Sequence, residues 1–357
     1  MKQASIQYQN TSYQIADIQS VEISTLSFSP YLQQTMAFCK EWLSGKEKFI
    51  VNTSGSTGTP KPIEISRTQM LESVRLTQVA FGLKGGEKAL VCLHTDYIAG
   101  KMMLIRGLEL GWQMLLQEPS SNPLEKITEP FDFVAFVPLQ LQTILEKIPE
   151  KIQLLNQFKT IILGGAGISA SLESLIQNLQ VPVYHTYAMT ETITHIATRL
   201  LNTEQKQPYF KVIEGVKIRL DERDCLCITS PTTNFEEITT NDIAEIIDNQ
   251  YFKIIGRIDN IINSGGIKIQ LENIENQLEK VWEKLKIHQR FFCTGISDET
   301  FGQVLVLCIE GNILDKNTEY LIIKELSVFV NKYHLPKKIV YKEHFLETET
   351  GKIKRAL

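Results

Sequence analysis

The residues with the clearest capacity for chemistry form one continuous loop, residues 53–61, in which hydroxyl side chains and glycines lead up to a lysine. Its members are Thr53, Ser54, Gly55, Ser56, Thr57, Gly58, Thr59, Pro60 and Lys61. Glycines let backbone N–H groups approach an anion closely, the hydroxyls add donors, and the lysine adds a positive charge. This composition predicts a loop that holds phosphate groups.

The loop is not a Walker A motif. Pro60 stands where that motif has a glycine before its lysine, and the spacing from Gly55 to Lys61 is too short. A P-loop NTPase or kinase is therefore disfavoured. A serine-rich, solvated turn is the simpler alternative, but nine consecutive residues of this kind make it the weaker one.

Composition narrows the class of protein. The chain has 357 residues and a net charge of -4, which gives no basic surface for nucleic acid. It contains no apolar stretch that could cross a bilayer, and its first residues lack the apolar core of a signal peptide, so we expect a cytoplasmic protein. The six cysteines lie mostly in apolar runs, which favours buried thiols over a zinc site or disulfides.

Apolar strand-like runs alternate with helical patterns from residue 49 to about residue 186. The expected strands are residues 49–51, 90–93, 133–137, 160–163 and 181–184, and the expected helices are residues 68–81, 100–110, 139–147 and 170–179. Such alternation predicts an α/β fold with a mostly parallel sheet and helices on its faces. Ligands bind at the carboxyl ends of such strands, which directs attention to the loops that follow them.

The pattern changes after residue 208, where short β-rich runs predict antiparallel strands. A further unit begins near Gly256, with a hairpin at residues 261–269, a helix at 271–287, a strand at 303–309 and a helix near 318–333. We therefore expect a large N-terminal domain with a β-rich subdomain, followed by a small α+β C-terminal domain.

Five blocks in a fixed order, namely residues 53–61, 187–192, 240–242, 256–260 and 350–355, resemble the motifs of the acyl-adenylate-forming superfamily. This superfamily includes acyl-CoA synthetases, peptide-synthetase adenylation domains and luciferases. Residues 256–266, with Asp-Asn followed by Ser-Gly-Gly, and residues 162–166 look most like the o-succinylbenzoate–CoA ligases of menaquinone biosynthesis.

The chain also departs from that pattern. It is shorter than most relatives, with only some fifty residues before the phosphate loop, so part of the usual large domain is expected to be absent or reduced. Ala188 and Asn241 stand where glycines are common, and Glu347 stands where a proline often precedes the terminal Gly-Lys. None of these changes removes a reacting side chain.

The resemblance implies that loop 53–61 holds the β- and γ-phosphates of ATP, that Thr190 donates to a phosphate, and that Glu191 binds Mg²⁺ through a hard oxygen. Taken alone, a Thr-Glu pair is better explained by a helix start, which both residues favour. Joined to the phosphate loop, the metal and phosphate roles are the stronger interpretation.

The nucleoside is expected to lie against residues 164–166, Gly164, Gly165 and Ala166, with Tyr187 stacked on the adenine. Asp242 would accept hydrogen bonds from the ribose hydroxyls, and Arg257 would assist it. A plain strand-to-helix turn explains the small residues about as well, and an isolated Asp or Arg is usually a solvated surface charge.

Lys352 is expected to bring its ammonium group to the α-phosphate and carboxylate oxygens while acyl-AMP forms. A basic terminus is usually only solvated, and resemblance to the family's Gly-Lys block changes that interpretation for Lys352 alone. Lys354 and Arg355 are left as surface charges.

A second half-reaction is implied, in which coenzyme A supplies a thiol. Asp259 and Asn260 lie where the family hinges, and Ser264, Gly265 and Gly266 would line a channel for the pantetheine arm; an ordinary tight turn is the alternative for the hinge. The expected domains are residues 1–257, a hinge at 258–260 and a mobile domain at 261–357.

The acid pocket is less clearly marked. His94 follows a strand and resembles a family position at the acyl site, and Arg106, in an apolar helix, could pair with a substrate carboxylate. An arginine that reaches water from the helix edge is about equally consistent with the sequence. Thr194 and His195 are weaker candidates for the same pocket.

Together these features predict an enzyme that uses ATP, Mg²⁺ and coenzyme A to turn a carboxylic acid into an acyl-CoA, with o-succinylbenzoate as the favoured acid. Another aryl or acyl acid, or a carrier-protein thiol as acceptor, is the first alternative. A non-catalytic nucleotide-binding relative is the second, although the phosphate loop, the metal carboxylate and the terminal lysine are all present. The sequence leaves homo-oligomer formation open.

Overall fold

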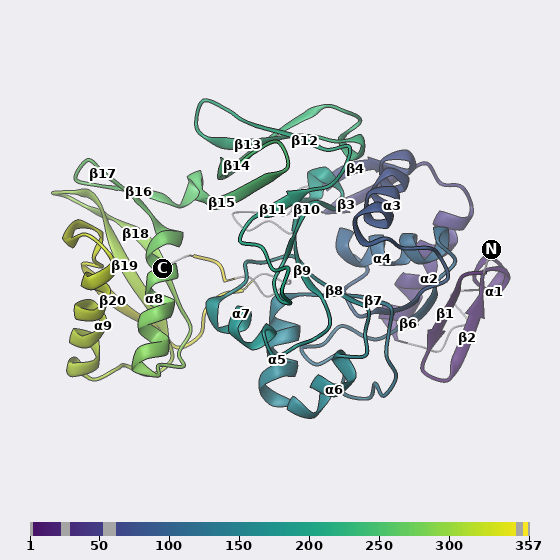
Figure 1. Ribbon diagram of the computed structural model, residues 1–357, viewed down its shortest axis with the longest axis horizontal. Coiled ribbons are helices and arrows are strands. Elements are labelled where there is room, and N and C mark those ends of the chain that lie inside the picture. Colours follow the sequence, from purple (N-terminus) through teal and green to yellow (C-terminus); the bar gives the residue numbers. More distant parts are fainter. Residues whose placement is uncertain (1–2, 23–28, 53–61, 348–352, 356–357) are drawn as a thin grey trace.

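The computed structural model describes residues 3–22, 29–52, 62–347 and 353–355 (Figure 1). A mixed sheet of thirteen strands runs through most of the described chain, and a five-stranded sheet forms its C-terminal part. Figure 1 shows the smaller sheet at one end of the molecule, with α8 (Leu271–Leu285) facing the larger part.

Parallel strands form the centre of the large sheet, as predicted. In spatial order they are β9 (Val183–Ala188), β8 (Thr160–Leu163), β7 (Phe133–Phe136), β5 (Lys88–Val91), β6 (Gln113–Leu116) and β1 (Ser5–Tyr8). All four residues of β7 are buried, because helices cover both faces of the sheet.

Two apolar cores lie on opposite faces of this sheet. Successive side chains of a strand point to opposite faces, and accordingly Ala89 and Val91 belong to one core while Leu90 and Cys92 belong to the other. The first core is covered by α2 (Pro30–Leu43), α3 (Arg67–Phe81) and α4 (Ile98–Glu109), and the second by α5 (Pro138–Lys147), α6 (Ile152–Leu155) and α7 (Ala170–Ile176). Figure 1 shows these two groups of helices on either side of the strands.

Antiparallel strands extend the sheet beyond β9, as the β-rich sequence after residue 208 predicts. They are β10 (His195–Leu200), β11 (Phe210–Val212), β15 (Tyr251–Arg257), β14 (Glu237–Ile246), β13 (Cys225–Thr229) and β12 (Lys217–Leu220). At the other edge β2 (Thr11–Gln14) pairs with β1 and leads into the short helix α1 (Ile15–Ser20).

One strand is not where the alternating pattern places it. The strand β3 (Lys48–Asn52) does not join the parallel sheet but pairs antiparallel with β4 (Pro62–Ser66) as a separate two-stranded sheet. The prediction missed β4 because it assigned no structure between the loop and the helix. Loop 53–61 therefore connects two antiparallel strands instead of following a parallel one.

The C-terminal part has its own sheet and core. Its strands are β16 (Ile261–Ser264), β17 (Ile267–Gln270), β18 (Phe291–Asp298), β19 (Gly302–Glu310) and β20 (Lys338–Lys342). The helices α8 and α9 (Lys316–Phe329) contribute Leu278, Val281 and Leu326 to an apolar core with these strands. Its α+β composition is the predicted one, while the predicted mobility and domain limits stay predictions.

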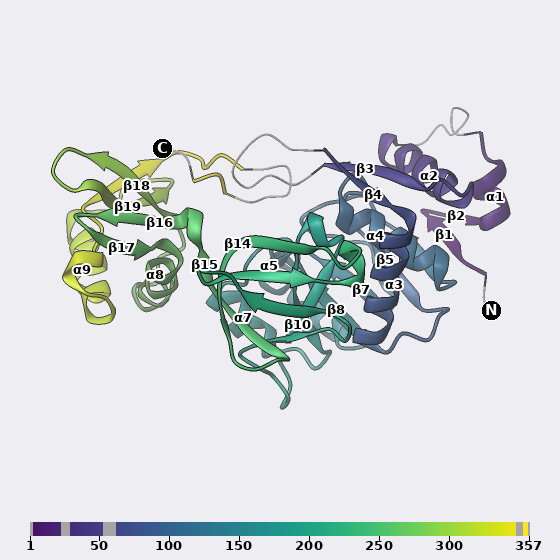
Figure 2. The ribbon, with the colours of Figure 1, turned by 90° about the horizontal axis from the view of Figure 1, so that it is seen from above.

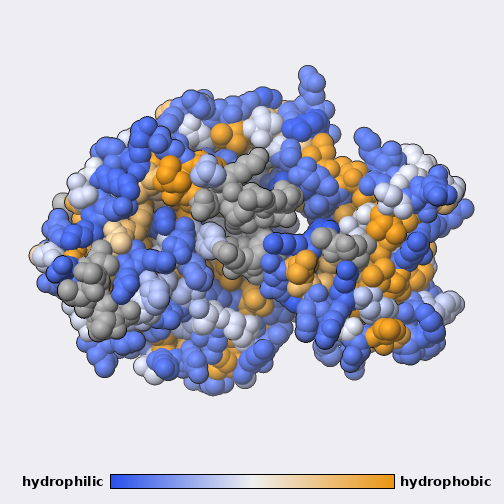
Figure 3. All heavy atoms as spheres, turned by 180° about the vertical axis from the view of Figure 1, so that it is seen from behind, coloured by the Kyte–Doolittle hydropathy of each residue, from blue (hydrophilic) through white to orange (hydrophobic). Residues whose placement is uncertain are grey.

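Away from the connecting segment, a polar contact joins the two parts within the described chain. The Glu279 carboxylate of α8 accepts a hydrogen bond from the Ala170 backbone N–H, the first residue of α7, at 2.7 Å. In the space-filling view from behind, a notch separates the C-terminal part from the rest of the surface (Figure 3). None of the helices in the described ranges is long and apolar enough to span a membrane.

The capping box that begins α3 is present as predicted. Ser66 Oγ accepts from the Gln69 N–H at 3.2 Å, and Gln69 Oε1 accepts from the Ser66 N–H at 3.0 Å. Gln69 also donates to the Thr232 carbonyl, so the same residue ties the helix to the segment after β13. All six cysteines are buried, also as predicted.

We expect Ser66→Ala to lower the free energy of unfolding by about 1 kcal/mol, because it leaves a helix N–H without its acceptor. Chemical denaturation followed by circular dichroism measures the change. Thr68→Ala, at an exposed position in the same first turn, is the control and should cause no loss. Equal losses in the two variants would contradict the capping role.

Candidate functional site

Part of the predicted site lies outside the described residues. This applies to the phosphate-loop residues Thr53, Ser54, Gly55, Ser56, Thr57, Gly58 and Lys61, and to Lys352. Their roles stay predictions.

Asp242 on β14 is the centre of a polar network that contains most of the predicted ribose site. The Tyr187 hydroxyl on β9 donates to Asp242 Oδ2 at 2.5 Å, and Arg257 Nη1 at the end of β15 donates to Asp242 Oδ1 at 2.7 Å. Burial and the nearby Asp242 carboxylate raise the pKa of Tyr187 well above its ordinary value, so its hydroxyl remains a donor. The structure thus brings together three residues that are far apart in sequence.

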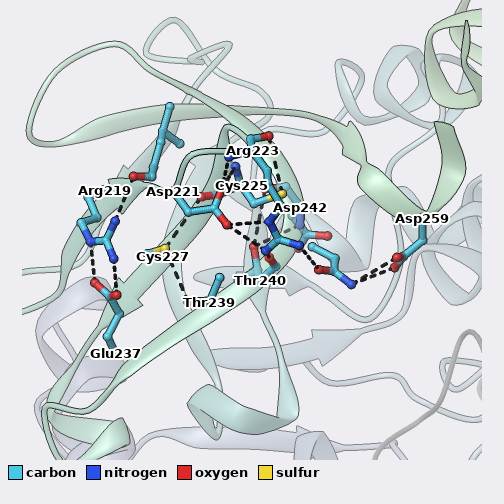
Figure 4. Close-up of polar contacts among 12 residues, drawn as sticks. Arg219, Asp221, Arg223, Cys225, Cys227, Glu237, Thr239, Thr240, Asp242 and Asp259 are labelled. Atoms are coloured by element: carbon cyan, nitrogen blue, oxygen red, sulfur yellow. Dashed lines mark hydrogen bonds and ion pairs between the residues drawn. The ribbon is translucent and has the colours of Figure 1, made fainter. Parts of the chain in front are cut away.

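The network continues into the predicted hinge. Arg257 Nη2 donates to Asp259 Oδ2 at 2.8 Å, and Asn241 Nδ2 lies 3.2 Å and 3.3 Å from the two oxygens of the same carboxylate. Figure 4 shows the polar contacts that run on from Asp259 to Arg223 and Asp221. Asn241, which stands where the family commonly has glycine, therefore adds a side-chain link to the hinge segment.

The second residue of the predicted hinge, Asn260, contacts the C-terminal part of the chain. Its side-chain amide donates to Glu272 in the first turn of α8. Both residues belong to the 3₁₀ turn Ile258–Asn260, which joins β15 to β16. Whether the chain turns at this point stays a prediction.

Small residues follow β8, as predicted for the adenine site. A Cβ at Gly164 would lie 2.8 Å from Thr186 Oγ1, so the backbone there approaches its neighbour too closely for a larger residue. Gly165 has a φ of +85°, and Gly165 and Ala166 are exposed. This part of the chain can therefore present bare backbone to a flat ring.

His185 is a residue of this region that the sequence reasoning missed. Its Nε2 lies 3.2 Å from the Ala166 carbonyl, while Nδ1 is buried and has no partner among the described residues. Burial, with a contribution from Arg199, lowers the pKa of His185 to about 3, so the ring is neutral. With Nε2 donating to that carbonyl, Nδ1 is the unprotonated nitrogen of the ring, and it is buried. Its position two residues before Tyr187 is the signal that could have identified it.

Thr190 and Glu191 lie in the short 3₁₀ helix Thr190–Thr192 after β9, at the carboxyl end of the strand. The Glu191 side chain is exposed and forms no ion pair with the described residues. Ile193 closes this turn with a φ of 65°, which is unusual for a β-branched residue and marks a constrained backbone. The carboxylate is therefore available to a ligand at the edge of the sheet.

Arg106 on α4 is buried, with only 2% of its surface exposed, so the alternative in which it reaches water is wrong. Its Nε donates to Thr77 Oγ1 at 3.0 Å and its Nη2 donates to Thr194 Oγ1 at 2.7 Å. His195 lies between the same two hydroxyls, with both of its ring nitrogens at 3.1 Å from them. The structure brings Arg106, Thr194 and His195 together as predicted and adds Thr77, which nothing in the sequence singled out.

The protons of this cluster can be assigned. Thr77 Oγ1 donates to the Ser73 carbonyl at 2.9 Å, so it must accept from both Arg106 and His195 Nε2. His195 Nδ1 is then an acceptor, and Thr194 Oγ1 donates to it. Burial lowers the pKa of His195 well below its ordinary value, with Arg106 contributing, so the ring is neutral. The arginine is the cation of the cluster.

No carboxylate in the described part of the chain lies within ion-pair distance of Arg106. Burial lowers the pKa of its guanidinium to about 9. A buried charge without a counter-ion is costly, and proteins normally pair it. Among the described residues the Arg106 charge therefore has hydroxyl partners but no counter-ion.

His94 is exposed and lies at the other end of α4 from Arg106. Its ring meets Tyr31 and Tyr97 edge-on, with centroids at 6.4 Å and 6.2 Å. A Cβ at Gly100 would lie 2.2 Å from the His94 carbonyl, so only glycine lets the first turn of α4 pack here. The nine residues from Ile98 to Arg106 span about 12 Å of helix, so the structure does not place the two predicted pocket residues in contact.

Ser264, Gly265 and Gly266 form the turn between β16 and β17. The two glycines have φ values of 58° and 85°, as a tight hairpin requires, and the Gly265 N–H donates to the Phe301 carbonyl at 2.8 Å. The local geometry is that of the predicted hairpin, and a role toward pantetheine stays a prediction.

Comparison with known proteins places these features in a family. The family model described as AMP-binding enzyme matches residues 38–226. The 2-succinylbenzoate–CoA ligase of Lactococcus lactis is 26% identical and aligns over 97% of this chain and 82% of its own length. The corresponding ligase of Staphylococcus epidermidis is 27% identical, with coverage of 86% and 68%.

Solved structures of acyl-CoA synthetases are also similar to this chain. An acyl-CoA synthetase (AMP-forming)/AMP-acid ligase II-like protein from Dyadobacter fermentans is 40% identical, with a TM-score of 0.64 and coverage of 95% of this chain and 96% of its own. The o-succinylbenzoate coenzyme A synthetase of Bacillus subtilis, solved with ATP and magnesium, has a TM-score of 0.71 at 19% identity and covers 86% and 68%. At that identity the second likeness concerns the fold.

We expect Arg106→Met to raise the free energy of unfolding by about 1–4 kcal/mol at neutral pH, because an apolar side chain replaces an unpaired buried cation. Chemical denaturation of both proteins measures it. Arg106 has a lowered pKa in the folded protein, so above about pH 9 the unfolded chain binds more protons and the wild type gains stability as pH rises. The difference between the two proteins should therefore be smaller at pH 10 than at pH 7. A destabilised variant would show that the cation serves the fold.

Proposed function

Because the chain belongs to the AMP-binding enzyme family and is an AMP-forming acid–CoA ligase, we propose that its acid substrate is o-succinylbenzoate. One observation carries this proposal, namely the buried Arg106 guanidinium with two hydroxyl partners and no carboxylate among the described residues. A monocarboxylic acid would present its only carboxylate to the α-phosphate of ATP. A dicarboxylic acid has a second one to offer to Arg106.

The nucleotide is proposed to bind along the polar network of Asp242. Asp242 would accept from the ribose hydroxyls, Arg257 would hold that carboxylate in place, and the exposed backbone of residues 164–166 would lie against the adenine, with Tyr187 at its side. Loop 53–61 would hold the β- and γ-phosphates.

Magnesium fits the donors at this edge of the sheet. The described residues contain no cluster of three or more metal-binding side chains, whereas Glu191 offers one exposed carboxylate next to Thr190. Mg²⁺ is commonly bound by one or two carboxylates together with substrate phosphates, and here it would neutralise phosphate charge. Glu191 would hold it, and Thr190 would donate to a phosphate oxygen.

The first half-reaction joins two anions. A carboxylate oxygen of the acid attacks the α-phosphorus of ATP, the bond to the bridging oxygen of pyrophosphate breaks, and acyl-AMP results. Charge develops on the phosphate oxygens during the attack, and the ammonium group of Lys352 is proposed to neutralise it. Lys352 would be needed in this step alone.

The second half-reaction transfers the acyl group to the sulfur of coenzyme A and releases AMP. Residues 261–357 are proposed to turn about Asp259 and Asn260, so that Lys352 withdraws and Ser264, Gly265 and Gly266 line the path of the pantetheine arm. The proposed limits of the two domains are residues 1–257 and 261–357.

Pyrophosphate release with a panel of acids tests the proposal, with o-succinylbenzoate, a monocarboxylic benzoyl analogue and unrelated acyl acids as substrates. We expect kcat/KM to be highest for o-succinylbenzoate and Arg106→Met to raise the KM for this acid about ten- to hundredfold, because a charge-assisted hydrogen bond is lost. The KM for the monocarboxylic analogue should stay within about threefold of the wild type by the same argument. Arg106→Lys, which keeps the charge, is the matched control and should retain part of the preference.

Equal effects of Arg106→Met on both acids would remove this residue from the acid site. If the enzyme prefers another acid, the assignment as an acid–CoA ligase stands and only the proposed substrate changes. Thioester formation is measured with coenzyme A and with a phosphopantetheinylated carrier protein, and a faster reaction with the carrier protein would exclude coenzyme A as the acceptor.

We expect Lys352→Ala to slow acyl-AMP formation by at least about a hundredfold, while thioester formation from supplied acyl-AMP stays close to the wild-type rate, because the ammonium is needed only for the first transition state. Acid-dependent pyrophosphate release and thioester release from synthetic acyl-AMP measure the two steps. Lys354→Ala, two residues away and exposed, is the control. Equal loss in both steps would refute the role assigned to Lys352.

A further inference from the structure

The last described residues of the chain return to the C-terminal sheet. Glu347 and Ile353 form an antiparallel bridge, and the Lys354 N–H donates to the Leu346 carbonyl at 2.7 Å. The residues on both sides of positions 348–352 therefore lie next to each other. Figure 2 shows this end of the chain beside β18 and β19.

Apolar contacts hold this pair of segments to the sheet. Phe345 is 8% exposed and packs edge-on against Phe292 of β18, with ring centroids 4.8 Å apart. Val306 and Cys308 of β19 complete this cluster, and Ile353 packs against it.

Arg355 is not the surface charge that the sequence predicts. Its Nη2 donates to Glu275 Oε2 of α8 at 2.6 Å, and its Nη1 donates to the Cys293 carbonyl of β18 at 3.4 Å. Glu275 Oε1 accepts from the Cys293 N–H at 2.7 Å, so one carboxylate ties the chain end to both the helix and the sheet. The Glu275 and Arg355 side chains are only 17% and 29% exposed, so solvent screens this ion pair less than an ordinary surface pair. The sequence could not show this partner, which lies eighty positions away.

A second ion pair holds the segment before position 348. Arg290 binds Glu310 through two nitrogens, and its Nη1 donates to Glu347. Glu310 also accepts from the Phe345 N–H at 2.7 Å. Glu347, which stands where the family often has proline, thus has a partner of its own in this chain. Lys354, between the anchored residues, is exposed.

We propose that Glu275 and Arg355 are positioning residues for acyl-AMP formation, and that their ion pair holds residues 353–355, the segment that directly follows Lys352. Lys352 directly precedes Ile353 and lies three positions before Arg355. A lysine has a long, flexible side chain, so the place its ammonium group reaches depends on how firmly its backbone is held. The ion pair acts through Lys352 and touches neither substrate. The inference rests on the role proposed above for Lys352.

The test compares Arg355→Met and Glu275→Gln with Lys354→Met, which removes a neighbouring exposed charge. Acyl-AMP formation is followed as pyrophosphate release without coenzyme A, using o-succinylbenzoate or the panel acid that the wild type turns over. We expect both anchor variants to lower kcat by about ten- to hundredfold, because small misplacements of a reacting group have effects of this size. The KM values for ATP and for the acid should stay within about threefold of the wild-type values. In both anchor variants, thioester formation from supplied acyl-AMP should stay within about twofold of the wild-type rate. The rates of Lys354→Met should stay within about twofold of the wild type in both steps.

A double-mutant comparison separates positioning from a merely structural role. In a Lys352→Ala background, Arg355→Met should lower acyl-AMP formation by no more than about twofold, because the group it positions is already absent. Arg355→Lys, which keeps the charge, should recover part of the wild-type rate. Glu275→Gln keeps the shape and the acceptor for the Cys293 N–H, so it provides a folded variant if Arg355→Met is poorly stable.

The proposal is overturned if both anchor variants form acyl-AMP at the wild-type rate, if they slow both half-reactions equally, or if Arg355→Met retains its full effect without Lys352. A wild-type protein that releases no pyrophosphate with any acid of the panel contradicts the proposed function. An active wild type with unaffected anchor variants overturns the positioning role alone.

Discussion

The central sheet is held by apolar contacts on both of its faces, and the arrangement at its edge depends on this double burial. Because residues 89–92 send alternate side chains into two separate cores, a polar side chain at any of these positions would be buried. The polar side chains of the candidate site lie instead on the strands beyond this central region or in the segments that follow the parallel strands. Tyr187 lies near the end of β9, Glu191 follows β9 and the small residues follow β8, so all of them lie toward the edge where these neighbouring parallel strands end.

Arg106 is an exception, because it is a charged side chain buried among the apolar cores. The structure compensates for the cost of burying this charge only in part. Two threonine hydroxyls accept from the guanidinium, and a neutral histidine orients both hydroxyls. Hydroxyls satisfy hydrogen bonds but carry no opposite charge, so the electrostatic cost of burial remains. If the proposed acid binds here, its second carboxylate would supply the missing counter-charge and relieve that cost.

The sequence predicts those features that follow from local pattern. The buried strand Phe133–Phe136 is visible as an apolar run, and Ser66 marks the start of a helix through its own side chain. Pairing between distant segments is not encoded locally. The separate sheet of Lys48–Asn52, the contact of Thr77 with Arg106 and the ion pair of Arg355 depend on partners that only the folded chain supplies. Short motifs therefore indicated the chemistry, while the supporting contacts required the structure.

The contact between Glu279 and the first N–H of α7 couples the orientation of the C-terminal part to protons. Burial raises the pKa of Glu279 in the docked arrangement, although the Ala170 hydrogen bond opposes this effect. Separation of the two parts would return the carboxylate to water and restore its ordinary acidity. By linkage, such a separation would be accompanied by proton release only in the acidic range in which this carboxyl titrates, so acid would favour the docked arrangement.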